Sequence, residues 1–341
     1  MKKKKFNINL INTYRSYIFL LIVLVFGAFS ENFFTLFNIK SLLSSTSLYT
    51  FIGIGFTVCM IAGHMDLSVG YMATAGALVA LGMHTLTGLP WMVSILIAVA
   101  VGAVVGILNG LLVTKAKIHS FIATLGMQYV IRGGMYIYCE GKEISVKGDY
   151  GFSDKLSSVP IKFLPFNVLF IITLLCVVAF SIVLAYTRFG RNIYMLGGNL
   201  ETAWLAGINS DRATIIVFML SSMSCALGGA LFGIFQGTAT PTLGEKGIAP
   251  LMIAMTATII GGTDIAGGKG KVLDTFISIT AIVAMFSVVT SLLGKFEYQI
   301  LLIGFVLALC VFYETLLKYI KQKEVGMRPN LIIKYHEEKG R

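Results

Sequence analysis

Long apolar segments recur along this chain, and they constrain its fold more than any other feature. A run of about twenty apolar residues has the length of a helix that crosses a bilayer. Ten such spans can be counted, of which the first and the eighth are short: Tyr17–Phe29, Leu42–Ala62, Leu67–Thr87, Pro90–Thr114, Ser120–Tyr138, Phe166–Tyr186, Ala213–Gln236, Ile248–Ile260, Val272–Leu293 and Tyr298–Leu317. Only 13% of the 341 residues are charged, against about 25% in a soluble protein. We therefore expect an all-α, polytopic membrane protein with about ten transmembrane helices.

The distribution of charge predicts the orientation of these spans. A run of lysines precedes the first span, and no small-residue cleavage site follows it, so we expect a retained helix with a cytoplasmic N-terminus. Ten spans then return the C-terminus to the cytoplasm. In this layout Arg188, Arg191 and Arg212 lie inside, where basic residues outnumber acidic ones, whereas the outer side is balanced. This asymmetry agrees with the positive-inside rule.

The same layout predicts how the chain is organised. Residues 1–16 form a cytoplasmic basic segment, residues 17–317 the membrane domain and residues 318–341 a cytoplasmic tail. The longest inner loop covers about 187–212 and the longest outer loop about 139–164. The outer loop is polar and balanced in charge. It serves either as a docking surface for an extracytoplasmic partner or as a plain connector.

The inner loop contains a short apolar helix that needs a partner. Gly197-Gly198 is expected to break the chain and Asn199 to cap a helix of about two turns, from Leu200 to Ala206, before Gly207 ends it. Leu200 and Trp204 are four residues apart and share one face of that helix. A helix this short is marginal by itself, so we expect its apolar face to dock against something outside the membrane.

Small residues also mark sites of close packing and tight turns. Gly102, Gly106 and Gly110 lie on one face of the fourth span, which favours close helix approach either within the subunit or at a dimer seam. Two inner turns share a pattern of glycine and aspartate: Gly63, Asp66 and Gly70 in the first, and Gly261, Asp264 and Gly268 in the second. We expect each aspartate to cap the following helix while the glycines permit the turn.

The sequence lacks the patterns typical of an enzyme. The four histidines are scattered and neither HExxH nor a His/Cys cluster occurs, so no metal site is expected. Gly268-Lys269-Gly270-Lys271 fails as a phosphate-binding loop, because Thr263 stands where glycine is required and Gly270 where Ser or Thr is required. Asp66 and Asp264 lie at span ends, and Arg132 is interpreted either as snorkelling outward or as a buried functional charge.

Several segments together resemble the permease subunits of ribose-type (simple-sugar) ABC importers. They are Gly63–Gly70, Ile118–Gly126 with Arg132-Gly133, Gly197–Asn209 and Ile260–Leu273, in the family's order over nearly the whole chain. The sequence departs from the family's usual residues at His64 and Met65, Leu200, Trp204, Asp264 and Asp274.

The resemblance implies a multi-pass subunit of the bacterial inner membrane that moves a monosaccharide by alternating access. It implies a second permease copy or a sister permease beside it in the lipid bilayer, an extracytoplasmic sugar-binding protein, and a cytoplasmic ABC ATPase that binds ATP and Mg. This chain itself would bind no cofactor and no nucleic acid. The ATPase-coupling residues would be Asn199, Leu200, Glu201, Trp204 and Gly207.

The residues of a sugar pathway are expected to be aromatic, methionine or small polar, because a sugar presents hydroxyls and apolar ring faces. Candidates are Phe56, Met60, Phe235, Gln236, Met252, Met255 and Thr256, for each of which helix packing or lipid contact is the competing interpretation. Other classes of function are a stand-alone secondary transporter of a small polar solute, a membrane enzyme and a regulatory membrane subunit.

Overall fold

The computed structural model describes residues 8–30, 32–146, 148, 151–159, 166–244, 249–295 and 297–326. The first part of the predicted N-terminal basic segment, residues 1–7, and the end of the predicted tail, residues 327–341, lie outside the described residues. The described chain is helical apart from one short pair of strands. The all-α fold expected from the sequence is therefore confirmed.

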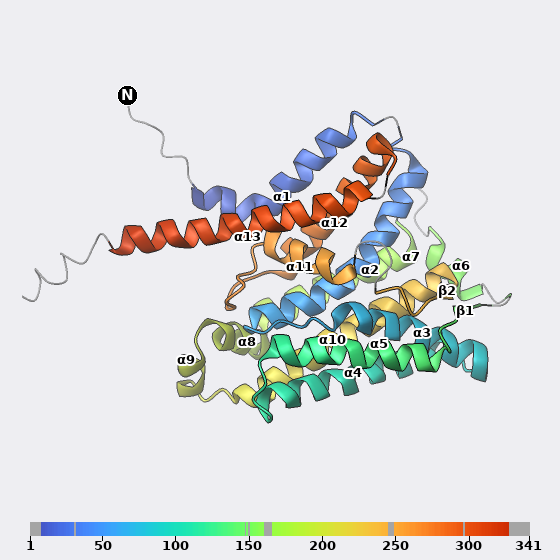
Figure 1. Ribbon diagram of the computed structural model, residues 1–341, viewed down its shortest axis with the longest axis horizontal. Coiled ribbons are helices and arrows are strands. Elements are labelled where there is room, and N and C mark those ends of the chain that lie inside the picture. The colour runs from blue at the N-terminus through green and yellow to red at the C-terminus, as the bar shows by residue number, and fades with distance from the viewer. Residues whose placement is uncertain are drawn as a thin grey trace, which may run out of the picture.

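The helices and strands follow one another in the order shown in Figure 1. They are α1 (Ile8–Gly27), α2 (Leu36–Ile61), α3 (Val69–Thr87), α4 (Trp91–Thr114), α5 (Ser120–Tyr138), β1 (Ile144–Ser145), α6 (Gly151–Ser157), α7 (Val168–Tyr186), α8 (Arg188–Gly198), α9 (Leu200–Leu205), α10 (Ser210–Gln236), β2 (Thr238–Ala239), α11 (Pro250–Ile260), α12 (Val272–Leu293) and α13 (Glu297–Gly326). The strands β1 and β2 pair antiparallel, with Ile144 opposite Ala239.

Each apolar span predicted from the sequence coincides with a helix. Within the described part of the chain, six helices are long and apolar enough to cross a membrane, namely α2, α3, α4, α7, α10 and α12. The apolar parts of α1, α11 and α13 are shorter, and α5, which carries Gln128 and Arg132, is not among the six. The structure thus supports a polytopic membrane protein.

Helix α10 is the central helix of the fold and packs directly on α4. A Cβ atom added to Gly106 would lie 2.4 Å from the Phe218 carbonyl oxygen, and one added to Gly102 would lie 2.8 Å from that of Ser222. Gly110 faces Ile215 in the same way. The glycines of the fourth span therefore serve packing within the chain, the first of the two interpretations given above.

Helix α3 approaches α10 just as closely, next to α4. Gly229 faces the Ala73 carbonyl oxygen, and Gly76 faces that of Ala226, so each helix supplies a glycine where the other's backbone passes. Such contacts let the helix backbones approach closely. In a membrane this packing matters because lipid tails are as apolar as the side chains, so apolar burial alone does not favour helix association. Helices α4 and α7, by contrast, are largely exposed along their apolar lengths, as expected for lipid contact.

The two ends of the helix bundle carry different features (Figure 1). Helices α8 and α9 lie at one end, where α1 begins and α13 ends. Helix α6 and the strands β1 and β2 lie at the other. The predicted inner and outer loops are therefore at opposite ends of the molecule.

Candidate functional site

Helix α9 forms as the sequence predicts. The Asn199 Oδ1 atom accepts a hydrogen bond from the Thr202 N–H at 3.0 Å, which caps the first turn. The helix ends at Leu205, and Gly207 adopts a left-handed φ of +75°, which favours glycine. The predicted cap, helix and glycine stop are confirmed.

The apolar face of α9 is exposed. Leu200, Trp204 and Leu205 expose 60%, 72% and 77% of their surfaces, and Ala203 on the other face is fully buried. The helix thus rests on its small residue and presents its large apolar side chains outward. Isolated exposed apolar residues are common on any protein, but three on two turns of helix outside the long spans form a surface suited to a partner.

Helix α8 was not predicted, and the break expected at Gly197-Gly198 falls immediately after the pair, at the extended Asn199 between α8 and α9. The two glycines form the last turn of α8. Thr187 caps this helix by accepting a hydrogen bond from the Gly190 N–H at 3.2 Å. Ile193 and Leu196, three residues apart, are buried along it. That helical spacing was the signal available in the sequence.

Gly197 lies where three segments meet. A Cβ atom at this position would be 1.9 Å from the Ile61 carbonyl oxygen and 2.6 Å from the Gly268 nitrogen. The Gly268 N–H donates to that same Ile61 oxygen at 2.8 Å, and the Tyr194 hydroxyl donates to the Gly270 carbonyl oxygen at 2.7 Å. Helix α8 therefore touches both the end of α2 and the loop that precedes α12.

The two turns with matching glycines and aspartates lie beside each other at this junction. A Cβ atom at Gly267 would be 2.7 Å from the Gly63 Cα atom. The expected helix caps were wrong, however. Ser68, not Asp66, occupies the N-cap position of α3, and Asp264 accepts from the Ala266 N–H within a loop, well before α12 begins at Val272. Each aspartate instead closes a local turn with the residue two positions later.

The other glycines of the two turns have separate surroundings. Gly70 lies inside α3, where an added Cβ atom would be 3.5 Å from the Leu251 nitrogen. Gly261 ends α11 and packs against the start of α12, where an added Cβ atom would be 2.9 Å from the Thr275 nitrogen. Both positions therefore hold neighbouring segments close together.

Asp66 is fully buried although it lies at a span end as predicted. Its Oδ1 atom accepts from the Ser68 N–H at 3.0 Å and the Ser68 hydroxyl at 2.5 Å, and its Oδ2 atom accepts from the Ser221 hydroxyl at 2.9 Å. Asn109 donates to the Ser68 hydroxyl at 3.1 Å. At 1.5 Å per residue, Ser221 lies about 16 Å from the start of α10. The turn that contains Asp66 therefore reaches into the bundle.

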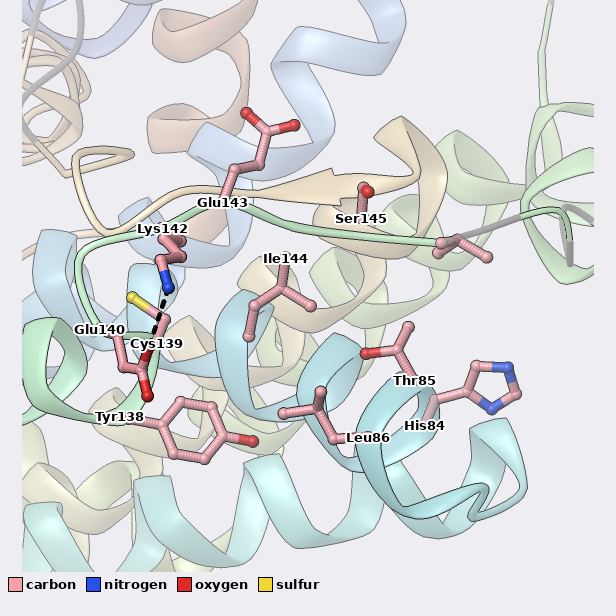
Figure 2. Close-up of a pocket in the computed structure, with 11 residues that line it drawn as sticks. His84, Thr85, Leu86, Tyr138, Cys139, Glu140, Lys142, Glu143, Ile144 and Ser145 are labelled. Atoms are coloured by element: carbon pink, nitrogen blue, oxygen red, sulfur yellow. Dashed lines mark hydrogen bonds and ion pairs between the residues drawn. The ribbon is translucent and has the colours of Figure 1, made fainter.

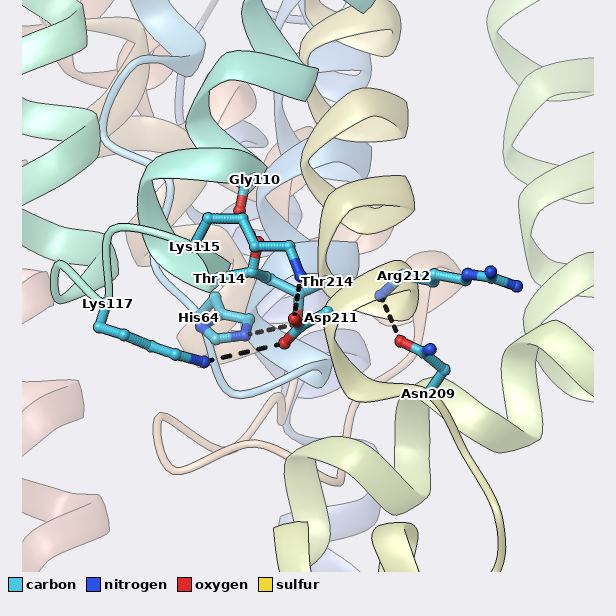
Figure 3. A network of polar contacts seen from close by, with 9 residues as sticks. All are labelled: His64, Gly110, Thr114, Lys115, Lys117, Asn209, Asp211, Arg212 and Thr214. Atoms are coloured by element: carbon cyan, nitrogen blue, oxygen red, sulfur yellow. Dashed lines mark hydrogen bonds and ion pairs between the residues drawn. The ribbon is translucent and has the colours of Figure 1, made fainter.

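The adjoining polar contacts fix the same turn to the start of α10 (Figure 3). The His64 ring nitrogen Nε2 and the Thr214 hydroxyl are 3.2 Å apart. Burial, with a smaller effect from His119, lowers the pKa of His64 to about 4. Lys115 and Lys117, at the end of α4, pair with Asp211 at 2.7 and 4.0 Å. Contacts from α2–α3, α4 and α10 thus converge beside α9.

The predicted pathway residues are not gathered at one surface. Phe56, Met60 and Thr256 are fully buried, and Thr256 Oγ1 has no hydrogen-bond partner among the described residues. Phe235 and Met255 are partly buried, whereas Met252 and the last residue of α10, Gln236, are exposed. Their role in a sugar pathway stays a prediction.

A cavity of about 530 Å³ lies at the end opposite α9, between the ends of α3 and α5 and strand β1 (Figure 2). His84 lines it and stacks on Trp91 with 3.6 Å between the ring centroids. Glu140 and Lys142 pair at 2.9 Å on its wall. Their hydrogen bond and opposite charges lower the pKa of Glu140 and raise that of Lys142.

Comparison with known proteins agrees with this architecture. Residues 38–311 match a family model described as a branched-chain amino acid transport system / permease component. The ribose import permease protein of Bacillus subtilis (strain 168) is 33% identical over 296 residues, which cover 86% of this chain and 89% of that protein. The chain belongs to the simple-sugar ABC importer permease family.

Other relatives are named for ribose or for another sugar. The ribose import permease protein of Escherichia coli (strain K12) is 31% identical over 271 residues, covering 76% of this chain and 79% of that protein. The D-allose transport system permease protein of the same strain is 30% identical over 314 residues, covering 89% and 92%. No solved structure matches the chain. The relatives are transport permease components and not enzymes, as expected for this chain.

Proposed function

We propose that this chain is the membrane-spanning subunit of an ATP-driven importer that carries a monosaccharide across the bacterial cytoplasmic membrane by alternating access. A separate cytoplasmic ABC ATPase binds ATP and Mg and supplies the energy. An extracytoplasmic sugar-binding protein delivers the cargo, and a second permease copy or a sister permease completes the pathway. Relatives named for ribose, D-allose, fructose and L-arabinose support a simple sugar as cargo.

The observation that carries this proposal is the exposed apolar face of α9, formed by Leu200, Trp204 and Leu205. Helix α9 follows α8, which touches the end of α2 and the loop before α12, so a load applied to α9 would reach two of the long helices through α8. We assign this face to the ATPase. The opposite end, with α6, the paired strands and the cavity near Glu140, is assigned to the binding protein.

The proposed topology has ten spans with both termini in the cytoplasm. It places α8 and α9 inside with Arg188, Arg191 and Arg212, in agreement with the positive-inside rule. A fluorescent-protein fusion at the C-terminus should fluoresce, and an alkaline phosphatase fusion after residue 157 should be active outside the membrane. Activity of the phosphatase at the C-terminus instead would contradict the topology.

Substitution of Trp204 tests the docking face. Trp204→Asp places a charge on the apolar surface without touching the buried Ala203, so the ATPase should co-purify at a much lower level while the membrane subunit stays monodisperse. Trp204→Phe keeps the face apolar and serves as the matched control. An undiminished complex with Trp204→Asp would refute the docking assignment.

One observation favours a second candidate, a proton-coupled secondary transporter. Asp66 is a fully buried carboxylate whose hydrogen-bond partners among the described residues are serines, and buried acids often mark proton pathways in transporters. Uptake into proteoliposomes separates the two functions. Transport that requires ATP and the ATPase, and survives an ionophore, supports the importer, whereas uptake without ATP under a proton gradient supports the alternative.

A further inference from the structure

Two adjoining cavities lie between the end of α7, helix α8 and the start of α12. One, of about 600 Å³, is lined by Tyr194, Lys269 and Lys271 among others. The second, of about 500 Å³, is lined by Arg188, Arg191 and the same Tyr194. Leu184 and Ala185 also line both. The shared residues make the two cavities one continuous groove.

The groove collects an excess of positive charge. Lys269, Lys271, Arg188 and Arg191 are exposed, and none of the four forms an ion pair with another described residue. Asp274 is the one acidic side chain on its wall among the described residues, and it is partly buried. It is close to Lys271 but also to Arg15 and Tyr17. The net charge of the lining is therefore positive, which suits an anionic ligand.

Neutral hydrogen-bond donors accompany these charges. Helix α12 begins at Val272 without a side-chain cap, and Val272 and Leu273 line the cavity, so the unpaired N–H groups of a helix start are available there. The Ser181 hydroxyl lines the same cavity and has no hydrogen-bond partner among the described residues. A phosphate at the start of α12 would accept hydrogen bonds from these N–H groups.

The other wall of the groove is apolar and continues onto the membrane-facing surface. Leu184 and Ala185 belong to the last turn of α7 and line the groove. Earlier along the same helix, Leu175, Val178 and Ile182 are exposed. Leu273, in the first turn of α12, is also exposed. A free anion would leave this surface uncovered, whereas a lipid would place its phosphate among the basic side chains and its acyl chains along α7 and α12.

We propose that this groove binds the headgroup of an anionic glycerophospholipid from the cytoplasmic leaflet. The position at the ends of two long helices, the excess of basic side chains and the adjoining apolar surface together match such an amphiphile. The proposal rests on the cytoplasmic placement of α8 and not on the transport of a sugar. A lipid bound here contacts Tyr194 and Lys271, which flank the junction beneath α9.

Lipid retention by the full-length chain tests this site. The protein is purified in mild detergent, incubated with phosphatidylglycerol or phosphatidylcholine at equal concentration, and examined by native mass spectrometry. We expect preferential retention of phosphatidylglycerol. Lys269→Gln with Lys271→Gln should weaken that retention about 30-fold, from roughly 1 kcal/mol for each basic residue near a lipid surface. Raising the salt concentration should also weaken it.

Matched variants separate binding from loss of fold. Lys269→Arg with Lys271→Arg keeps the charge and should keep the lipid. Lys115→Gln with Lys117→Gln removes two exposed charges near Asp211, outside the groove, and should leave retention unchanged. Equal retention of both lipids, or unchanged retention by the glutamine variant of the groove, would overturn the proposal. Displacement of the lipid by millimolar inorganic phosphate would also overturn it, in favour of a small-anion site. If the glutamine variant of the groove loses ATPase binding but retains its lipid, the proposal is also overturned, in favour of a protein interface.

Discussion

Replacing Gly197 by alanine should disrupt the junction that connects α8 to the membrane helices. The new Cβ atom would lie 1.9 Å from the Ile61 carbonyl oxygen, 2.6 Å from the Gly268 nitrogen and 3.0 Å from the Ala62 carbonyl carbon. All three are backbone atoms, so no side chain can rotate to make room. The α8 helix would have to move away from α2 and from the loop before α12.

The size of the effect follows from three contributions. Overpacking of a close contact costs about 1–3 kcal/mol, and weakening the hydrogen bond from Gly268 to Ile61 costs about 1 kcal/mol more. Alanine in a helix offsets this by about 0.5–1 kcal/mol relative to glycine. We expect the free energy of unfolding to fall by about 2 kcal/mol, which corresponds to roughly 3 °C in melting temperature for a chain of this length.

The neighbouring glycine provides the control. A Cβ atom at Gly198 would find its nearest neighbour, the Gly268 Cα atom, at 4.0 Å, so Gly198→Ala meets no obstacle and should be neutral or slightly stabilising. Scanning fluorimetry of both variants in the same detergent measures the difference. If Gly197→Ala melts at or above the temperature of Gly198→Ala, the close contact described for Gly197 does not exist in the folded protein.

Two further predictions concern the turn between α2 and α3. Ser221→Ala removes the donor to Asp66 Oδ2 and should lower the free energy of unfolding by about 1–3 kcal/mol, whereas Ser222→Ala, whose hydroxyl has no hydrogen-bond partner among the described residues, should not; equal melting temperatures for the two variants would contradict this. Because the pKa of folded His64 is lowered to about 4 from 6.5, stability should be complete above pH 6.5 and decline as the pH falls towards 4. Between pH 7 and pH 5 the loss should be roughly 2 kcal/mol, and His64→Gln should not show this component; an identical pH dependence of melting in both proteins would disprove it.

The bundle itself could be predicted from the sequence because lipid leaves few alternatives. Twenty apolar residues in a bilayer must form a helix to satisfy their backbone groups, and each predicted span is helical. The cap of α9 could also be predicted, since Asn199 and Gly207 act through their immediate neighbours. Local chemistry and length were sufficient for these features.

The junction and the buried aspartate could not be predicted in the same way. The environment of Gly197 depends on Ile61 and Gly268, which are far away in sequence. Similarly, Asp66 lies at a span end in the sequence, but its partner Ser221 lies well inside α10. The periodicity of one segment carries no information about which backbone passes its glycine or which hydroxyl reaches its carboxylate. Only the packed helices determine those contacts.

The composition of the junction bears on how the proposed ATPase would drive transport. Gly63, Gly197, Gly267 and Gly268 bring three backbones into direct contact, and the Gly268–Ile61 hydrogen bond joins two of them. Long side chains between these segments would take up a displacement by changing rotamer, whereas backbone atoms in contact transmit it. A movement of α9 and α8 would therefore reach α2 and α12 together. In the proposed cycle this direct contact lets ATP-driven closure shift both helices in one step.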